Sequence, residues 1–195
     1  MLIPHVRLLK TPVMSLQTGA QLALTSRVLV DPRDLTIVAY ELEGSMLDEH
    51  PSYLRPVDVR ELSNLGFIVD SSDEFVGEND VIRIKQVSDY DFELVGLPVI
   101  DEHKKKLGKI QGFNVDAGSY SVQQIVVKRP LLRSLGETEL LIHRSQILEV
   151  SSAHIKVDTG SIREPEPTKN IVREYSNPFR TGNVQPEAIR RAEHS

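Results

Sequence analysis

Short apolar runs separated by turn residues recur along residues 1–160, a pattern that favours β-strands. In the first third of the chain the apolar runs lie at 6–16, 22–30 and 37–42. Gln17-Thr18-Gly19 separates the first two runs, and Asp31-Pro32-Arg33-Asp34 separates the second from the third. Both separators have turn chemistry, because glycine accepts a positive φ and proline suits the second position of a turn. The pattern predicts a meander of three strands.

The same pattern returns in the stretch 98–128. Pro98-Val99-Ile100-Asp101 corresponds to Pro12-Val13-Met14-Ser15 and precedes two further apolar runs, at 107–115 and 122–127. Self-similarity of this kind is the signature of a repeated structural unit. We therefore interpret the chain as one small β unit that occurs twice.

The two copies also agree at their ends. The spacing from Val59 to Phe67 equals the spacing from Ile147 to Ile155, and agreement at both ends argues against coincidence. The opening segments match as well: Val6-Arg7-Leu8-Leu9 in the first copy and Phe92-Glu93-Leu94-Val95 in the second.

The repeat divides the chain into a first domain at 1–78, a second at 79–160 and a C-terminal tail at 161–195. Units this small have a thin core, so we expect the two to pack together. In the connector, Val81-Ile82-Arg83-Ile84 is expected to pack against one unit. The tail is polar and contains prolines, a composition that predicts disorder in isolation.

The repeated motifs resemble tandem PRC-barrel domains, over residues 6–70 and 92–158. The motifs are a Pro-Val turn, a Leu-Gly-Lys or Leu-Ala-Leu segment, a Val-Asp turn, and a closing Gln-Ile-Leu-Glu-Val or Asp-Val-Arg-Glu-Leu element. The family takes its name from the cytoplasmic domain of the photosynthetic reaction-centre H subunit, and a similar barrel forms the C-terminal half of a ribosome-maturation factor. The first copy departs from the pattern at Ala23, where the family often has glycine, so its second strand is expected to differ in shape.

The resemblance implies an all-β fold of two tandem small antiparallel β-barrels that act as protein-interaction modules, with no catalytic residues to carry over. The sequence shows neither the N-terminal membrane helix of the reaction-centre subunit nor the additional barrel of the maturation factor. The residues expected to shape the turns of the two barrels are Gly19, Asp31, Pro32, Gly108 and Asp116.

Charge and composition narrow the classes of function. The net charge of −5 argues against general nucleic-acid binding, which depends on neutralising phosphates. The longest basic run, Lys104-Lys105-Lys106, lies in a predicted hairpin turn, either as a solvated turn or as a phosphate-contacting patch. The chain has no cysteine, no secretory signal and no run of about 20 apolar residues. We expect a cytoplasmic protein without membrane insertion.

The sequence contains no recognisable catalytic or cofactor motif. Its six histidines form no i, i+4 pair of the kind that binds metals, and nucleophile elbows, phosphate-binding loops and dinucleotide fingerprints are missing. The stretch 70–74 resembles the start of a calcium loop, but Phe75 stands where the sharp turn requires glycine. We predict no enzyme activity, no cofactor and no metal site.

Two clusters of apolar residues are candidate partner contacts. Leu131 and Leu132 lie in a long loop, where they cover one end of a barrel or form a partner-binding lip. Ile171 and Val172 begin an apolar cluster in the tail, which is either incidental or a linear motif that orders on a partner. The predicted partner-binding residues are Leu131, Leu132, Tyr175, Pro178 and Phe179.

Three functions fit these observations. The first is a non-enzymatic adaptor that binds a protein partner. The second is a ribosome-associated or RNA-processing factor, based on the resemblance and on the basic turn, with a ribosomal component as partner. The third is a small-molecule-binding barrel, which requires a pocket with convergent polar groups.

Overall fold

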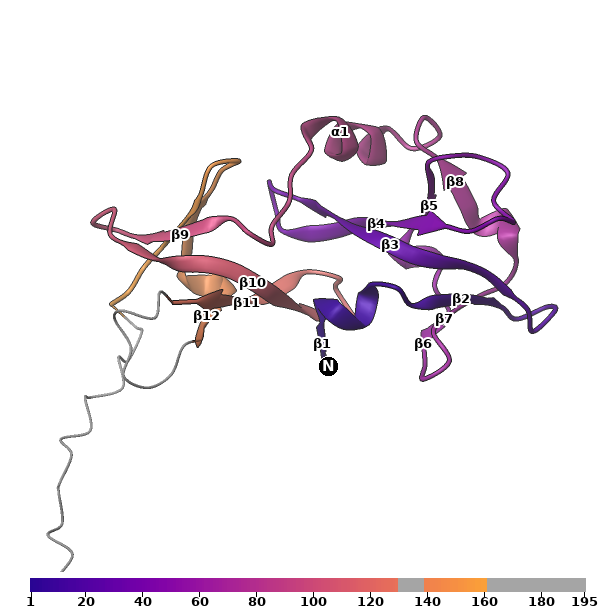
Figure 1. Ribbon diagram of the computed structural model, residues 1–195, viewed down its shortest axis with the longest axis horizontal. Coiled ribbons are helices and arrows are strands. Elements are labelled where there is room, and N and C mark those ends of the chain that lie inside the picture. Colours follow the sequence, from indigo (N-terminus) through magenta and orange to yellow (C-terminus); the bar gives the residue numbers. More distant parts are fainter. Residues whose placement is uncertain (130–138, 161–195) are drawn as a thin grey trace, which may run out of the picture. The chain divides into compact units, whose positions relative to one another are not determined.

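The computed structural model describes residues 1–129 and 139–160, which fold mainly as two seven-stranded β-sheets (Figure 1). The first sheet has the strand order β6-β7-β2-β3-β4-β5-β8. The second has the order β13-β14-β9-β10-β11-β12, and β1 also pairs with β10. The first sheet contains β2 (Pro12–Ser15), β3 (Gln21–Asp31), β4 (Thr36–Glu43), β5 (Ser52–Leu54), β6 (Glu61–Leu62), β7 (Phe67–Val69) and β8 (Phe75–Gly77). The second contains β1 (Leu2–Pro4), β9 (Pro98–Asp101), β10 (Lys106–Asp116), β11 (Val122–Lys128), β12 (Glu139–His143), β13 (Ile147–Val150) and β14 (Ile155–Val157).

The two sheets share one strand order, as the internal repeat predicts. Val30 of β3 pairs with Ile37 of β4, and Val115 of β10 pairs with Val122 of β11. In both sheets the strand pair has a register shift immediately before this valine. The described residues also form one α-helix, α1 (Ile82–Tyr90). They form four 3-10 turns, at His5–Leu8, Pro56–Asp58, Ser72–Glu74 and Arg144–Gln146.

The predicted β fold is confirmed in its mostly β content, but the two antiparallel barrels are not observed among the described residues. Both sheets are mixed, because β7 runs parallel to β2 and β14 runs parallel to β9. In each repeat the chain crosses to the far side of β2 or β9 before its last hairpin, and this crossing creates the parallel pair. Within the part of the chain that the structure describes, the end strands of each sheet do not pair with each other, so neither sheet closes into a barrel.

One local prediction is wrong, and another is confirmed because Ile84 of the connector is buried against Leu29 and Ala39 of the first sheet. The expected strand at 6–16 is interrupted by the 3-10 turn at His5–Leu8 and by Lys10, whose φ is +52°. The connector contains β8 and the helix α1, whose buried residues Ile84 and Val87 lie one turn apart. No side chain caps the start of α1, so the usual signal for a helix N-terminus is missing.

Both repeats contribute to one hydrophobic core. The same buried cluster contains Val13, Tyr40 and Phe67 from the first repeat and Val99 and Ile125 from the second. All the described residues belong to one compact unit, and the predicted boundary at 78/79 falls in the turn before α1 and stays a prediction. Among the described helices, none has the length and apolar character needed to cross a membrane.

Candidate functional site

The two repeats meet through equivalent residues. The Ile37 N–H donates to Tyr120 O at 2.8 Å, and the Val122 N–H donates to Leu35 O at 2.8 Å. Between these two bonds Thr36 forms an antiparallel bridge with its counterpart in the second repeat, Ser121. Reciprocal bonds between equivalent positions define a local two-fold axis, as in a symmetric dimer interface.

The segment that leads into each repeat packs against the other repeat. β1 pairs with β10 of the second sheet, where Ile3 lies opposite Val115. In the opposite direction, Arg27 of β3 forms ion pairs with Asp91 at 2.8 Å and with Glu93 at 3.5 Å. The leading segments are therefore exchanged between the repeats.

A groove of about 190 Å³ lies where these segments cross, and we call it the axial groove. Its lining includes two equivalent pairs, Leu9 with Val95 and Val28 with Phe113, so it lies on the local two-fold axis. The lining residues are His5, Leu9, Ser26, Arg27, Val28, Val30, Phe92, Glu93, Leu94, Val95 and Phe113.

The floor of the axial groove is apolar and aromatic. Phe92, Leu94 and Phe113 are buried. The imidazole of His5 stacks on the Phe113 ring with the centroids 5.0 Å apart, and its Nδ1 accepts the Phe113 N–H at 3.4 Å. Burial lowers the pKa of His5 below its usual value, which favours the neutral ring. A Cβ at Gly112 would lie 2.6 Å from the His5 ring, so this glycine makes room for the stack.

The rim of the groove is charged. Arg27 is the basic residue among the lining residues, and its ion pairs hold Asp91 and Glu93 at the rim. Val95 lies between floor and rim and is 40% exposed. The one hydroxyl in the lining, that of Ser26, donates to Glu41 O at 3.2 Å. An apolar floor with a net acidic rim is suited to binding an apolar side chain with a cationic flank.

The predicted turn aspartates lie at equivalent strand ends. Asp116 Oδ2 accepts the N–H groups of Gly118 at 3.2 Å and Ser119 at 3.0 Å. Asp31 is buried, and its carboxylate accepts hydrogen bonds from Arg33 and Arg83. Hydrogen bonding from the Arg33 guanidinium is the main cause that lowers the pKa of Asp31 to about 2.

Gly19 and Pro32 lie in turns, whereas Gly108 does not. Gly19 has a φ of +70° in the β2–β3 turn, and Pro32 follows Asp31 in the β3–β4 turn. Gly108 lies inside β10, so the prediction that it is a turn residue is wrong. A Cβ there would lie 2.1 Å from Lys128 O, and this close approach of backbones explains the glycine.

The predicted partner-binding residues lie outside the described residues. Leu131 and Leu132 belong to the range 130–138, and Tyr175, Pro178 and Phe179 to the range 161–195. Lys104, Lys105 and Lys106 are exposed at the β9–β10 turn.

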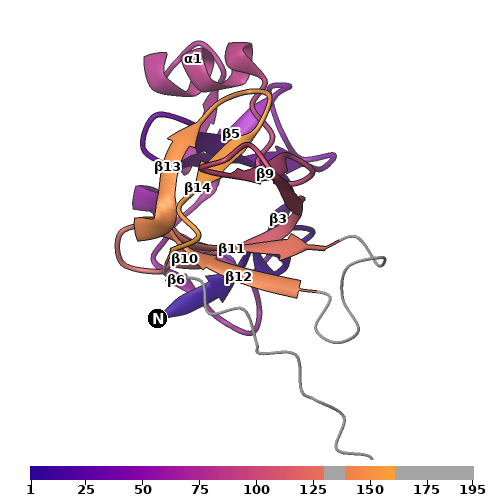
Figure 2. The ribbon, with the colours of Figure 1, turned by 90° about the vertical axis from the view of Figure 1, so that its left-hand side faces the viewer.

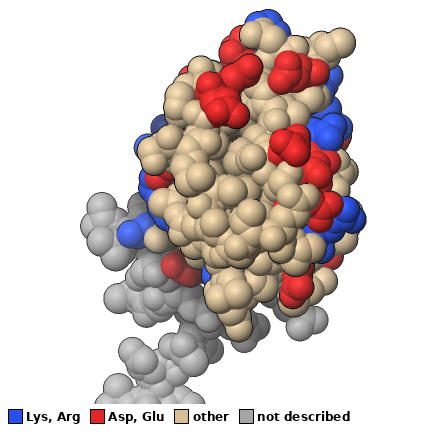
Figure 3. Space-filling view, turned by 90° about the vertical axis from the view of Figure 1, so that its right-hand side faces the viewer, with Lys and Arg blue, Asp and Glu red and all other residues tan. Residues whose placement is uncertain are grey.

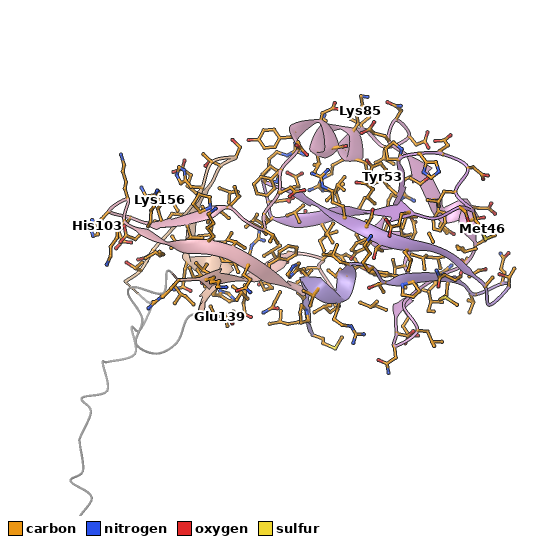
Figure 4. All side chains as sticks on the ribbon, viewed as in Figure 1. Met46, Tyr53, Lys85, His103, Glu139 and Lys156 are labelled. Carbon is orange, nitrogen blue, oxygen red and sulfur yellow. The ribbon has the colours of Figure 1, made fainter. Side chains whose placement is uncertain are left out.

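The end of the molecule that carries Met46 has an exposed apolar residue beside a group of acidic side chains. Met46, labelled in Figure 4, is 65% exposed. Figure 3 shows this end, with few charges at its centre, acidic side chains in its upper part, and acidic and basic side chains together along one rim. A cavity of about 230 Å³ beside Met46 is lined by Asp48, Glu49, Asp73 and Asp80, among others. In the described part of the chain, no group of three or more His, Asp or Glu side chains is arranged to hold a metal ion.

Sequence reasoning missed the axial groove because its lining comes from four separate segments. One available signal was the match between Val6-Arg7-Leu8-Leu9 and Phe92-Glu93-Leu94-Val95, since both segments contribute to the lining. The exchange of these segments between repeats depends on the two-fold packing, which no local pattern encodes. No protein-family model matches this chain, and no curated protein matches it either.

Proposed function

We propose that this chain is a non-enzymatic protein-interaction module whose axial groove receives one apolar side chain of a protein partner. The observation that carries the proposal is the combination of the buried floor at Phe92 and Phe113 with the exposed apolar edge at Val95. Anchors of binding energy at protein interfaces are single large side chains inserted into such depressions. A volume of about 190 Å³ suits one side chain and is below the roughly 300–1,000 Å³ typical of small-molecule sites.

The charge around the groove defines the chemistry of the partner. Asp91 and Glu93 outnumber Arg27 at the rim, and the chain as a whole carries a net charge of −5. A partner segment with Lys or Arg beside its apolar anchor is therefore attracted to this surface.

The architecture is proposed to be a tandem pair of PRC-barrel-like repeats that fold as an adaptor. The shared strand order of the two sheets supports this assignment. Further support comes from the glycine inside β10, which lies in the Leu-Gly-Lys segment that carries the resemblance.

Selection of peptides from a random displayed library against the full-length protein tests the proposed function. The selected peptides are expected to share an apolar residue flanked by Lys or Arg. Val95→Lys should weaken their binding at least about tenfold, because it blocks the groove and removes the net negative charge of the rim. The matched control is Val57→Lys, at a residue that is 74% exposed outside the groove, and it should leave the dissociation constant unchanged. Equal binding by wild type and Val95→Lys in fluorescence anisotropy would contradict the proposal.

A ribosomal partner is the second candidate function, favoured by the exposed lysines at 104–106. Co-sedimentation of the full-length protein with ribosomal particles at low and high salt tests it. Association that weakens with salt and is lost when the three lysines are changed to glutamate supports this candidate. Absence from the ribosomal fractions at low salt counts against it.

A further inference from the structure

The outer edge of β12 pairs with no strand among the described residues, and Figure 2 shows β12 at the margin of its sheet. The equivalent strand of the first sheet is β5, because Leu54 pairs with Tyr40 as Ile142 pairs with Ile125. The outer edge of β5 is covered by β8, in antiparallel register. One repeat therefore demonstrates that this edge of the sheet accepts a further antiparallel strand.

The outward face of β12 is complementary to itself. Glu139, Leu141 and His143 are exposed and alternate with the partly buried Leu140 and the buried Ile142. In an antiparallel pair of two β12 strands centred on Leu141, Leu141 lies opposite the same residue of the second copy. In that register each Glu139 lies opposite His143 of the other copy. An apolar pair flanked by two acid–imidazole pairs is a favourable set of cross-strand neighbours.

The edge also lacks lysine, proline and bulges, and one backbone group at its end is occupied, because the His143 N–H donates to Gln146 Oε1 at 2.8 Å. Proteins protect exposed edge strands with lysine, proline or bulges, and residues 139–143 contain no lysine or proline. Leu141 is 54% exposed, whereas its equivalent in the first repeat, Tyr53, is 2% exposed beneath α1 and Val76. The apolar residue at this position is thus covered in one repeat and exposed in the other.

We propose that β12 pairs with β12 of a second copy of this chain, about a two-fold axis at Leu141. The pairing joins the second sheets of two copies into one continuous sheet and buries both Leu141 side chains. Because the same edge is used in both copies, the contact closes after two chains and yields a dimer rather than a filament. The axial groove lies on other segments and is left free in both copies.

Sedimentation equilibrium of the full-length protein tests the proposed dimer. The wild type should show a monomer–dimer equilibrium. Leu141→Asp should raise the dissociation constant at least about tenfold, because it places two carboxylates opposite each other. Glu139→Lys should also weaken the dimer, and adding His143→Glu to that variant should restore it. Leu148→Asp is the matched control, since Leu148 is 57% exposed on β13 at the opposite edge of the same sheet. It should leave the dimer intact.

Cross-linking provides a second measurement that does not depend on weakening the contact. The chain has no cysteine, so Leu141→Cys introduces a single thiol that faces its own copy across the axis. Mild oxidation should produce a disulfide-linked dimer from Leu141→Cys and not from Leu148→Cys, as read on a non-reducing gel. A wild type that stays monomeric, a dimer insensitive to Leu141→Asp, or equal cross-linking of the two cysteine variants would each overturn the proposal.

Discussion

Single aspartates end the strands of both repeats and organise the turns that follow. Asp101 Oδ1 accepts the N–H groups of His103 at 2.9 Å and Lys105 at 2.7 Å, as Asp116 does for its own turn. Asp31 differs because its carboxylate is buried and is held by two arginines. Asp31 and Asp116 occupy equivalent positions. Asp116 shapes its own turn, whereas Asp31 also fixes α1, because its partner Arg83 belongs to that helix.

The Asp31 carboxylate predicts a loss of stability in acid. Its pKa is about 2 in the folded protein, below the usual 3.8, so its contribution is present above about pH 4 and is lost as the pH falls through 2. The difference corresponds to about 2 kcal/mol. Urea unfolding between pH 5 and pH 2 should show this loss in the wild type and a smaller one in Asp31→Asn. An identical pH dependence in the two proteins would contradict the assignment.

The two repeats have different residues at one equivalent strand position, glycine in β10 and alanine in β3. Gly108 of β10 lies beside the backbone of Lys128, whereas its equivalent in β3 is Ala23, which is 3% exposed. Gly44 follows β4 beside Ala23, and a Cβ at Gly44 would lie 3.4 Å from Ala23 Cα, an ordinary contact. Arg129 follows β11 at the corresponding point of the second repeat.

Gly108→Ala should destabilise the protein by about 1–3 kcal/mol, because the new methyl group meets backbone atoms that cannot turn away. The expected result is a lower urea midpoint with an unchanged m-value. Gly118→Ala is the matched control: a Cβ there would meet the Asp116 carboxylate at 3.4 Å, an ordinary contact. Equal midpoints for the two variants would show that β10 and β11 separate easily at this point.

At the scale of elements, α1 accounts for the main asymmetry between the repeats. The outward face of the first sheet presents Leu29, Ala39 and Tyr53, and α1 buries them with Ile84 and Val87 (Figure 4). In the second sheet, Asn114 and Gln124 occupy the positions of Leu29 and Ala39, and their side chains bond to each other at 3.0 Å. A polar face of this kind needs no covering helix.

Ile84→Ala therefore tests whether α1 is part of the fold rather than a passive connector. Ile84 is fully buried, so truncation should cost about 2–5 kcal/mol of unfolding free energy. Ile82→Ala, at a position 77% exposed on the same helix, should change stability by less than about 0.5 kcal/mol. Chemical denaturation followed by circular dichroism measures both, and a similar small effect of the two substitutions would mean that α1 contributes little.

The sequence predicted the strands and the duplication well because both depend on local patterns. The spacing shared by Val59–Phe67 and Ile147–Ile155 marks equivalent points, since Val59 and Ile147 each follow a 3-10 turn and Phe67 and Ile155 each begin the parallel strand. The parallel pairing itself, the helix α1 and the axial groove depend on contacts between distant segments. A pattern of apolar and polar residues carries no information on which strand lies beside which, so these features were not predictable.

At the scale of the whole molecule, the local two-fold axis makes the repeats depend on each other. The backbone bonds at Ile37 and Val122 tie β4 to the start of β11. Arg144 adds a link from the second repeat, because its guanidinium donates to Asp34 O and to Val122 O. One hydrophobic core joins both sheets. Removing apolar volume from one repeat should therefore lower the stability of the other repeat as well.

We expect the repeats to unfold as one cooperative unit, and Ile125→Ala tests this. Ile125 is fully buried in the second sheet, and its truncation should cost about 2–5 kcal/mol. Hydrogen exchange followed by NMR should show that the slowest amides of β3 and β4, in the untouched repeat, lose protection by the same free energy as those of β10 and β11. Val57→Ala, at an exposed position, should change neither set. If β3 and β4 keep their full protection in Ile125→Ala, the repeats are independent domains, and the reciprocal bonds at the two-fold axis hold them together without coupling their folding.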